Sequence, residues 1–229
     1  MNPTPHFEAL CSDAEAVGLA CRGGFHPESG DGVPAFADGG AAATLVLYGF
    51  VGSRQWPAFA ASTERADGLP NALDRWSRRV IDALGARYGA AGLYPSDGPP
   101  WLPFQRWARR AGPLHHSPLG ILIHPEFGLW HAFRGALAFR ARVALPERDR
   151  RPSPCESCVD KPCLAGCPVG AVKPDRYDHG ACLDHVSSRA GADCLESGCR
   201  ARRRCPVGEV FRYPAAQAAF HMEAFVRRR

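Results

Sequence analysis

The chain has 229 residues and a formal net charge of +5, from 28 Lys and Arg against 23 Asp and Glu. This length suits one medium domain and one small domain. The longest uncharged apolar stretch, residues 41–51, is too short to cross a bilayer, so we expect no membrane span. Residues 1–20 contain no Lys or Arg and therefore lack the charged start of a secretory signal, which favours a cytoplasmic location.

The first 145 residues have an α/β pattern. Residues 6–20 can form a short helix, and the apolar run at 44–51 (TLVLYGFV) predicts a buried strand. Asn71 is placed to cap a helix in which five residues recur at helical spacing: Leu73, Trp76, Val80, Leu84 and Tyr88.

Two more strands are expected before residue 145. Residues 119–123 predict a short strand. From Gly135 to Leu145, apolar residues alternate with Arg140 and Arg142, which predicts a strand with one apolar face and one arginine face. The apolar face would consist of Leu137, Phe139, Ala141, Val143 and Leu145.

A charged, proline-rich segment at 146–154 (PERDRRPSP) predicts a linker. The expected organisation is therefore a first domain at 1–145, a cysteine-rich domain at 155–213 and a C-terminal helix within 214–229. We expect this last helix to pack back on the first domain.

Eight of the ten cysteines fall into two sets that each end in Cys-Pro. The first set is Cys155, Cys158, Cys163 and Cys167, and the second is Cys182, Cys194, Cys199 and Cys205. In the bacterial run C-x2-C-x2-C-x3-C-P, the fourth cysteine ligates the other of two iron–sulfur clusters. Here the second gap is four residues instead of two, and the second set is more widely spaced.

This pattern predicts two 4Fe–4S clusters with crossed ligands. One cluster would take Cys155, Cys158, Cys163 and Cys205, and the other would take Cys167, Cys182, Cys194 and Cys199. The alternatives are one cluster with spare thiols, a zinc site, or disulfides. Structural zinc does not require C-x3-C-P, and disulfides require an oxidising compartment.

The remaining cysteines, Cys11 and Cys21, stand apart and are expected to be ordinary buried thiols. Four arginines lie inside the second cysteine set: Arg200, Arg202, Arg203 and Arg204. We expect their charge to offset that of the clusters. No array of stacking aromatic residues accompanies them, so no nucleic-acid partner is expected.

The string H-P-x-F-G-x-W-x-x-x-R occupies residues 124–134 (HPEFGLWHAFR). It resembles a segment of the CblC family of cobalamin decyanases and dealkylases, where it joins two strands of a nitroreductase-like domain that holds the corrin. The strand at 44–51 followed by WPAF at 56–59 is similar to the same family. The stretch RRAG…GILIHPEFGLW, followed by two cysteine sets, also resembles epoxyqueuosine reductase and, more distantly, reductive dehalogenases.

The resemblance implies an α+β protein with a nitroreductase-like, CblC-like domain and a small two-cluster ferredoxin-like domain. It also implies cobalamin as a bound corrinoid. The residues expected to contact the corrinoid are His115, His116, His124, Phe127, Gly128, Trp130 and Arg134. In this hypothesis the glycine lets backbone approach the macrocycle, the tryptophan covers its face, and the arginine pairs with its tail.

We therefore expect an oxidoreductase that binds cobalamin, reduces it through two clusters and removes its upper axial ligand. Its partners would be the corrinoid and an external electron donor such as a flavodoxin, a ferredoxin or a reductase. Two alternatives stay open: a corrinoid-dependent reductase of a separate substrate, and a ferredoxin-like electron carrier without corrinoid. The chain lacks the D-x-H-x-x-G string of the familiar histidine-on-cobalt domain.

Overall fold

A computed structural model describes residues 4–227 and divides the chain into two compact units. The first unit runs up to Gly112 and resumes from Ala132 to Arg150, and the second comprises Pro113–His131 and the chain from Arg151 onward. The last boundary, between Arg150 and Arg151, lies within the segment expected to be a linker. Residues 113–131, which we had assigned to the first domain, group with the cysteine-rich segment.

The first unit is mixed α+β, as expected, and is built on a four-stranded sheet in the order β1-β2-β6-β3. Strands β1 and β2 are antiparallel, as are β3 and β6. The strands are β1 (Ala20–Phe25), β2 (Thr44–Val51), β3 (Ala91–Leu93) and β6 (His131–Phe139). The helices are α1 (Phe7–Ala16), η1 (Ser29–Asp31), α2 (Trp56–Ala60), α3 (Thr63–Ala66), α4 (Ala72–Tyr88) and α5 (Phe104–Ala111).

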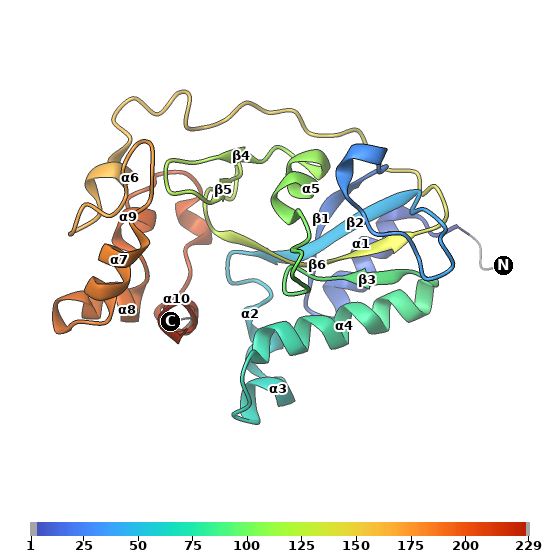
Figure 1. Cartoon of the computed structure of the whole chain (residues 1–229), viewed down its shortest axis with the longest axis horizontal. Helices are drawn as coiled ribbons and strands as arrows, with labels where there is room; N and C mark the ends of the chain where they lie inside the picture. Colours follow the sequence, from blue (N-terminus) through green and yellow to red (C-terminus); the bar gives the residue numbers. More distant parts are fainter. Residues whose placement is uncertain (1–3, 228–229) are drawn as a thin grey trace. The chain divides into compact units, whose positions relative to one another are not determined.

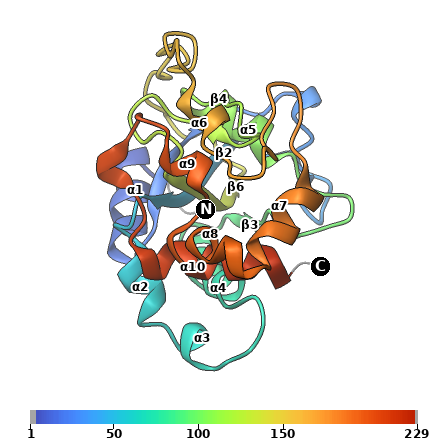
Figure 2. The same ribbon diagram turned by 90° about the vertical axis from the view of Figure 1, so that its left-hand side faces the viewer.

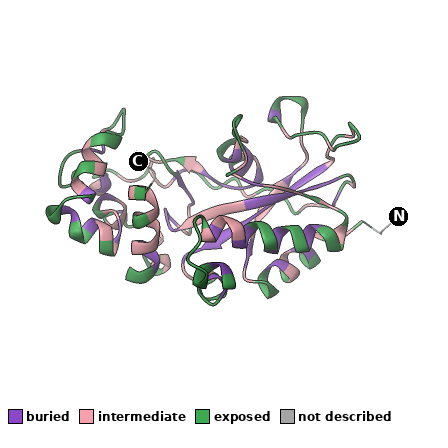
Figure 3. Ribbon diagram, turned by 60° about the horizontal axis from the view of Figure 1, so that its bottom comes forward, coloured by how far each residue is buried: buried purple, intermediate pink, exposed green. Residues whose placement is uncertain are grey.

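Helices cover both faces of this sheet, with α4 along one face and α5 along the other (Figure 1). The eight residues of β2 are buried without exception, and Figure 3 shows buried, purple stretches in the sheet. An uninterrupted apolar run is what a strand covered on two faces requires. The predicted buried strand at 44–51 is confirmed.

Helix α4 forms where the sequence predicted it, and its apolar stripe faces the core. Four of the five predicted positions are buried: Leu73, Trp76, Val80 and Leu84. The helix starts after Asn71, but this residue adopts a left-handed conformation and its side chain makes no capping hydrogen bond. The position of the cap was therefore correct and its chemistry was wrong.

The strand predicted for Gly135–Leu145 ends earlier, at Phe139, and its alternation is wrong because β6 is buried on both faces from Gly135 onward. The Thr44 hydroxyl, at the start of β2, ends the pairing of β6 with β2. It donates to the Ala141 carbonyl (3.0 Å) and accepts from the Val143 N–H (2.9 Å), so a side chain replaces the backbone partner.

The second unit consists of short elements. It has an antiparallel pair, β4 (His115–His116) and β5 (Leu122–Ile123), so the strand predicted at 119–123 is shorter than expected. Its helices are α6 (Pro162–Ala165), α7 (His179–Val186), η2 (Arg189–Gly191), α8 (Ala192–Ser197), α9 (Arg200–Arg203), η3 (Glu209–Phe211) and α10 (Ala215–Arg227).

The predicted C-terminal helix is present as α10 and packs beside α8 in this unit (Figure 2). The expectation that it packs on the first domain is corrected accordingly, because its apolar face finds α8 as a partner. None of the helices formed by residues 4–227 is both long enough and apolar enough to span a membrane.

Candidate metal centre

The eight clustered cysteines all lie in the second unit, on or beside its short helices. Cys163, Cys182 and Cys194 belong to α6, α7 and α8, and α9 lies between Cys199 and Cys205. Local chemistry sets these helices: Pro162 begins α6, and the Asp178 side chain accepts a hydrogen bond from the Ala181 N–H at the start of α7 (3.0 Å). Each helix is short, so the chain turns repeatedly around the thiols.

One group of neighbouring thiols is Cys155, Cys158, Cys163 and Cys205. Burial raises the pKa of Cys155, and the nearby thiols of the other three raise it further. Burial likewise raises the pKa of Cys205, with Cys163 and Cys158 as neighbours. Two packing contacts support this group, because Cys155 packs against the apolar cluster that contains Cys205, and α6 packs on α9.

The other group is Cys167, Cys182, Cys194 and Cys199. Burial raises the pKa of Cys182, and the thiols of Cys199, Cys167 and Cys194 act in the same direction. Burial raises the pKa of Cys199, which again has Cys194 and Cys167 as neighbours. Helix α7, which carries Cys182, packs on α8, which carries Cys194. Each group thus takes members from both cysteine sets of the sequence.

Hydrogen-bond donors point at several of these sulfurs. The Ala171 N–H donates to Cys167 Sγ at 3.3 Å. Backbone N–H groups of Ala201 and Arg202 donate to Cys199, and that of Val207 donates to Cys205; each bond lowers the pKa of its thiol against the effect of burial. Such donors favour the thiolate form, which is the form that binds metal.

The thiol groups fit the ligand requirement of 4Fe–4S clusters. Each cluster requires four thiolates, and hydrogen bonds to the sulfurs tune its potential. Among residues 4–227, no three His, Cys, Asp or Glu side chains form a group able to hold a single metal ion. A 4Fe–4S cluster differs from such a site because each of its four thiolates binds a different iron.

The segment HPEFG forms a tight turn in the second unit. His124 and Gly128 exchange two backbone hydrogen bonds of 2.9 Å. The Nδ1 atom of buried His124 accepts from the N–H groups of Glu126 (3.1 Å) and Phe127 (3.2 Å), and its ring stacks on Phe127. The histidine therefore holds the turn together through an unprotonated Nδ1.

Two glycines allow this turn to pack on the Cys205-Pro206-Val207-Gly208 turn. Gly128 has φ +57°, and a Cβ there would overlap the Val207 carbonyl oxygen. Gly208 has φ +71°, and a Cβ there would overlap the Phe127 carbonyl. The close approach that we assigned to a macrocycle is made by the chain itself. The sequence analysis missed Gly208, whose signal was a glycine directly after Cys-Pro-x.

Trp130 is buried and contacts both Arg202 and Tyr213, whose ring meets the Trp130 ring edge-on at 5.4 Å between centroids. The guanidinium carbon of Arg202 lies 4.5 Å from the centre of the Trp130 ring and 4.6 Å from that of Tyr213. Its Nη2 donates to the Leu129 carbonyl at 2.5 Å. The neighbouring Arg203 contacts the Asp193 carboxylate. Arginines of this segment therefore have partners within the protein.

The remaining candidate residues are divided between the units. His115 and His116 form β4 in the second unit, where His115 Nε2 lies 3.0 Å from the Arg151 carbonyl oxygen and His116 is exposed. Arg134 lies in the first unit and forms an ion pair of 2.6 Å with Asp74. Six of the seven expected corrinoid contacts thus share a unit with the eight cysteines, and the seventh does not.

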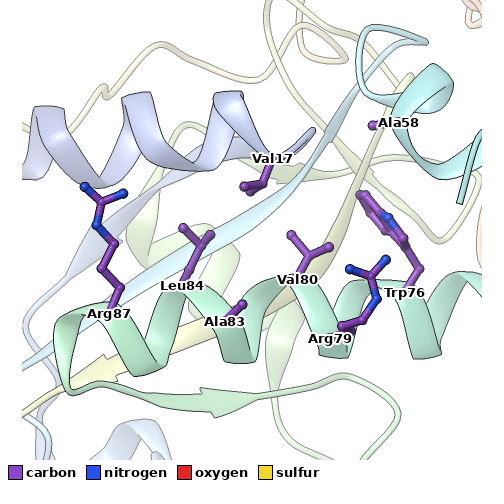
Figure 4. Close-up of a pocket in the computed structure, with 8 residues that line it drawn as sticks. All are labelled: Val17, Ala58, Trp76, Arg79, Val80, Ala83, Leu84 and Arg87. Carbon is purple, nitrogen blue, oxygen red and sulfur yellow. The ribbon is translucent and has the colours of Figure 1, made fainter.

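A cavity of about 330 Å³ lies in the first unit, between α4, α2 and the end of α1 (Figure 4). It is lined by Val17, Ala58, Trp76, Arg79, Val80, Ala83, Leu84 and Arg87. The two arginines are ion-paired with Glu64 and Asp13. None of the residues expected to contact a corrinoid lines this cavity.

A scan of the chain against models of known protein families finds no match. A comparison with curated protein sequences finds no match either. The function is therefore argued from the residues and their arrangement.

Proposed function

We propose that the protein is an oxidoreductase that binds two 4Fe–4S clusters in its second unit. The observation that carries this proposal is the grouping of eight thiols into two sets of four, each with members from both Cys-Pro segments. One cluster takes Cys155, Cys158, Cys163 and Cys205, and the other takes Cys167, Cys182, Cys194 and Cys199. When bound, such clusters supply single electrons at low potential.

The protein's own groups prepare these sites. Backbone N–H donors stabilise the thiolates of Cys167, Cys199 and Cys205, and Cys205 is also buried. Helix α9 has one ligand of each cluster at its two ends, so its four residues connect the two sites. Arg202 adds a positive charge beside this connection and contacts the rings of Trp130 and Tyr213.

The proposed substrate is cobalamin, which is reduced and loses its upper axial ligand. The support is the resemblance of residues 124–134 to a segment of the CblC family that joins two strands of its corrin-holding domain. Most of this segment shares a compact unit with the cysteines. His116 is exposed beside it and offers a polar contact.

A second candidate function is an electron carrier that binds no corrinoid. It is favoured by the partners that Gly128, Trp130 and Arg134 have inside the protein, since these were the residues assigned to the corrin. In this hypothesis the segment HPEFG supports the second cysteine turn and does nothing else.

Iron and sulfide analysis tests the clusters. Anaerobically reconstituted protein should contain roughly eight iron and eight sulfide per chain. A content of about four iron and four sulfide would reduce the proposal to one cluster. A protein without iron and sulfide would reject it.

A titration with aquocobalamin and cyanocobalamin tests the substrate. We expect binding with a shift to the base-off spectrum, and a Kd below about 100 µM, or about −5.5 kcal/mol. Binding weaker than this for both compounds, with eight iron retained, would favour the carrier.

Arg134→Ala and Asp74→Ala are matched variants because they remove either partner of one ion pair. If Arg134 contacts the corrinoid, only Arg134→Ala lowers the affinity. Equal behaviour of the two variants would restrict Arg134 to a structural role.

A further inference from the structure

Cys11 and Cys21 are brought together by a tight connection between α1 and β1. The chain reverses directly after the helix, where Gly18 N–H donates to the Glu15 carbonyl (3.0 Å) and Leu19 N–H donates to the Ala14 carbonyl (2.8 Å). Gly18 has φ +83°, as such a reversal requires. Helix α1, which contains Cys11, then packs on β1, which contains Cys21.

The two thiols are neighbours, and each is the largest influence on the pKa of the other. Both are free cysteines and both are half-buried. Neither thiol belongs to the cysteine groups of the second unit, and the two units are separate compact bodies. The sequence analysis expected Cys11 and Cys21 to be ordinary buried thiols, whereas both are only half-buried.

The surroundings make the two sulfurs unequal. The neighbouring Cys21 thiol lowers the pKa of Cys11, whereas the Cys11 thiol and burial raise the pKa of Cys21 well above its usual value. Glu8 and Glu15 face Cys11, and Arg22 faces Cys21. Tyr48, the strand partner of Cys21, is buried beside both thiols, and its hydroxyl has no hydrogen-bond partner among residues 4–227.

We propose that Cys11 and Cys21 are a redox-active dithiol that small-molecule disulfides of the glutathione type convert into an intramolecular disulfide. In this proposal Cys11 is the attacking sulfur and Cys21 is the resolving one, an order that the two single variants below test. A pair of this kind in a reducing compartment is typically transient and sensitive to redox conditions rather than structural.

The reaction balances as a two-step exchange. The Cys11 thiolate attacks one sulfur of the disulfide RS–SR, which leaves a mixed disulfide on Cys11 and releases RS⁻. The Cys21 sulfur then attacks the Cys11 sulfur, its proton passes to solvent, and the second RS⁻ leaves. Two electrons have moved from the protein dithiol to RS–SR, so the products are the Cys11–Cys21 disulfide and two RSH.

The sequence provides a direct assay, because no Lys or Arg lies between Cys11 and Cys21 and trypsin leaves both in one peptide that ends at Arg22. The full-length folded protein is incubated with oxidised glutathione, alkylated, digested and analysed by mass spectrometry. We expect this peptide to lose two hydrogens and to carry no alkyl group and no glutathione. The cluster cysteines lie in other peptides, so the result is independent of the proposed clusters.

Two variants test the order of attack. Cys21→Ser should trap glutathione on Cys11, at least ten-fold faster than Cys11→Ser traps it on Cys21. The proposal is overturned if the wild-type peptide keeps two alkylatable thiols, or if it collects two separate glutathiones. Equal trapping rates in the two variants would overturn the assigned order, and the wild-type result needs neither variant to fold.

Discussion

At the scale of single residues, two glycines determine how the second unit closes around Cys205. Gly128 and Gly208 each face a carbonyl of the opposite turn, so neither position has space for a side chain. Both have positive φ, which adds backbone strain for any other residue. Because the turn at Gly208 follows Cys205 directly, the packing of these two turns fixes the position of a proposed cluster ligand.

Gly128→Ala should destabilise the protein by about 2–4 kcal/mol, because left-handed strain and overlap with Val207 act together. Gly120→Ala is the matched control. Gly120 also has positive φ (+73°), but a Cβ there meets nothing within 4 Å, so the expected cost is about 1 kcal/mol. Urea unfolding followed by circular dichroism measures both. Equal losses for the two variants would contradict the contact between the turns.

At the scale of elements, α9 connects the two thiol groups. Cys199 stands directly before this four-residue helix and Cys205 follows it after one residue, and these two ligands belong to different groups. A crossed assignment is therefore a property of this helix and of the elements that it packs on. It can be tested by removing one ligand at a time.

Cys205→Ala should abolish the same cluster as Cys158→Ala, and Cys199→Ala should abolish the other one. Each variant should keep about four of roughly eight irons. The electron paramagnetic resonance spectrum after reduction distinguishes the clusters. Matching spectra for Cys205→Ala and Cys199→Ala, with a different one for Cys158→Ala, would exclude the crossing.

Ion pairs join α3 to α4 in the first unit. Arg79 Nε lies 2.5 Å from a carboxylate oxygen of buried Glu64, and the Arg79 guanidinium lowers the pKa of Glu64 to about 2. A carboxyl group whose pKa is lowered on folding stabilises the protein at pH values above its pKa in the unfolded state. This stabilisation is lost as the pH falls through the pKa of the group in the folded state. The stabilisation by this ion pair should therefore be lost between about pH 5 and pH 2.

Glu64→Gln should lower Tm at pH 7 by about 2–4 °C, which corresponds to roughly 1 kcal/mol after solvent screening of the exposed arginine. The difference from wild type should be smaller at pH 4 than at pH 7. Thermal unfolding by circular dichroism at the two pH values measures it. A difference that grows on acidification would show that this pair does not set the pH dependence.

At the scale of the whole molecule, the formal charge of +5 describes the protein without its proposed clusters. Buried thiols with raised pKa are neutral near pH 7. Two clusters with four thiolates each add roughly −2 apiece. The loaded protein should therefore carry a net charge of about +1, although its sequence is basic.

Cluster loading should lower the isoelectric point from the sequence value of about 8.8 towards neutrality. Anaerobic isoelectric focusing of the protein before and after reconstitution measures this shift. A Cys199→Ala and Cys205→Ala double variant, which cannot complete either cluster, is the control and should not shift. An unchanged isoelectric point in loaded wild-type protein would contradict the charge assigned to the clusters.

The sequence by itself determined the features that depend on near neighbours in the chain. The spacing of Leu73, Trp76, Val80 and Leu84 predicted the core face of α4, and the unbroken apolar run of β2 predicted a strand buried on both faces. The cysteine spacing likewise predicted the two thiol groups, although each of them takes members from both Cys-Pro segments.

Only the tertiary structure decided which distant segments meet. The end of β6 depends on the Thr44 hydroxyl, which lies 99 residues before Val143 in the chain. Gly128 faces Val207, and Arg134 pairs with Asp74. Residues that the sequence analysis assigned to corrinoid binding therefore contact other residues of the chain. Cys11 meets Cys21 because a helix folds back on a strand. Periodicity and spacing encode none of these contacts, since each depends on the packing of whole elements in space.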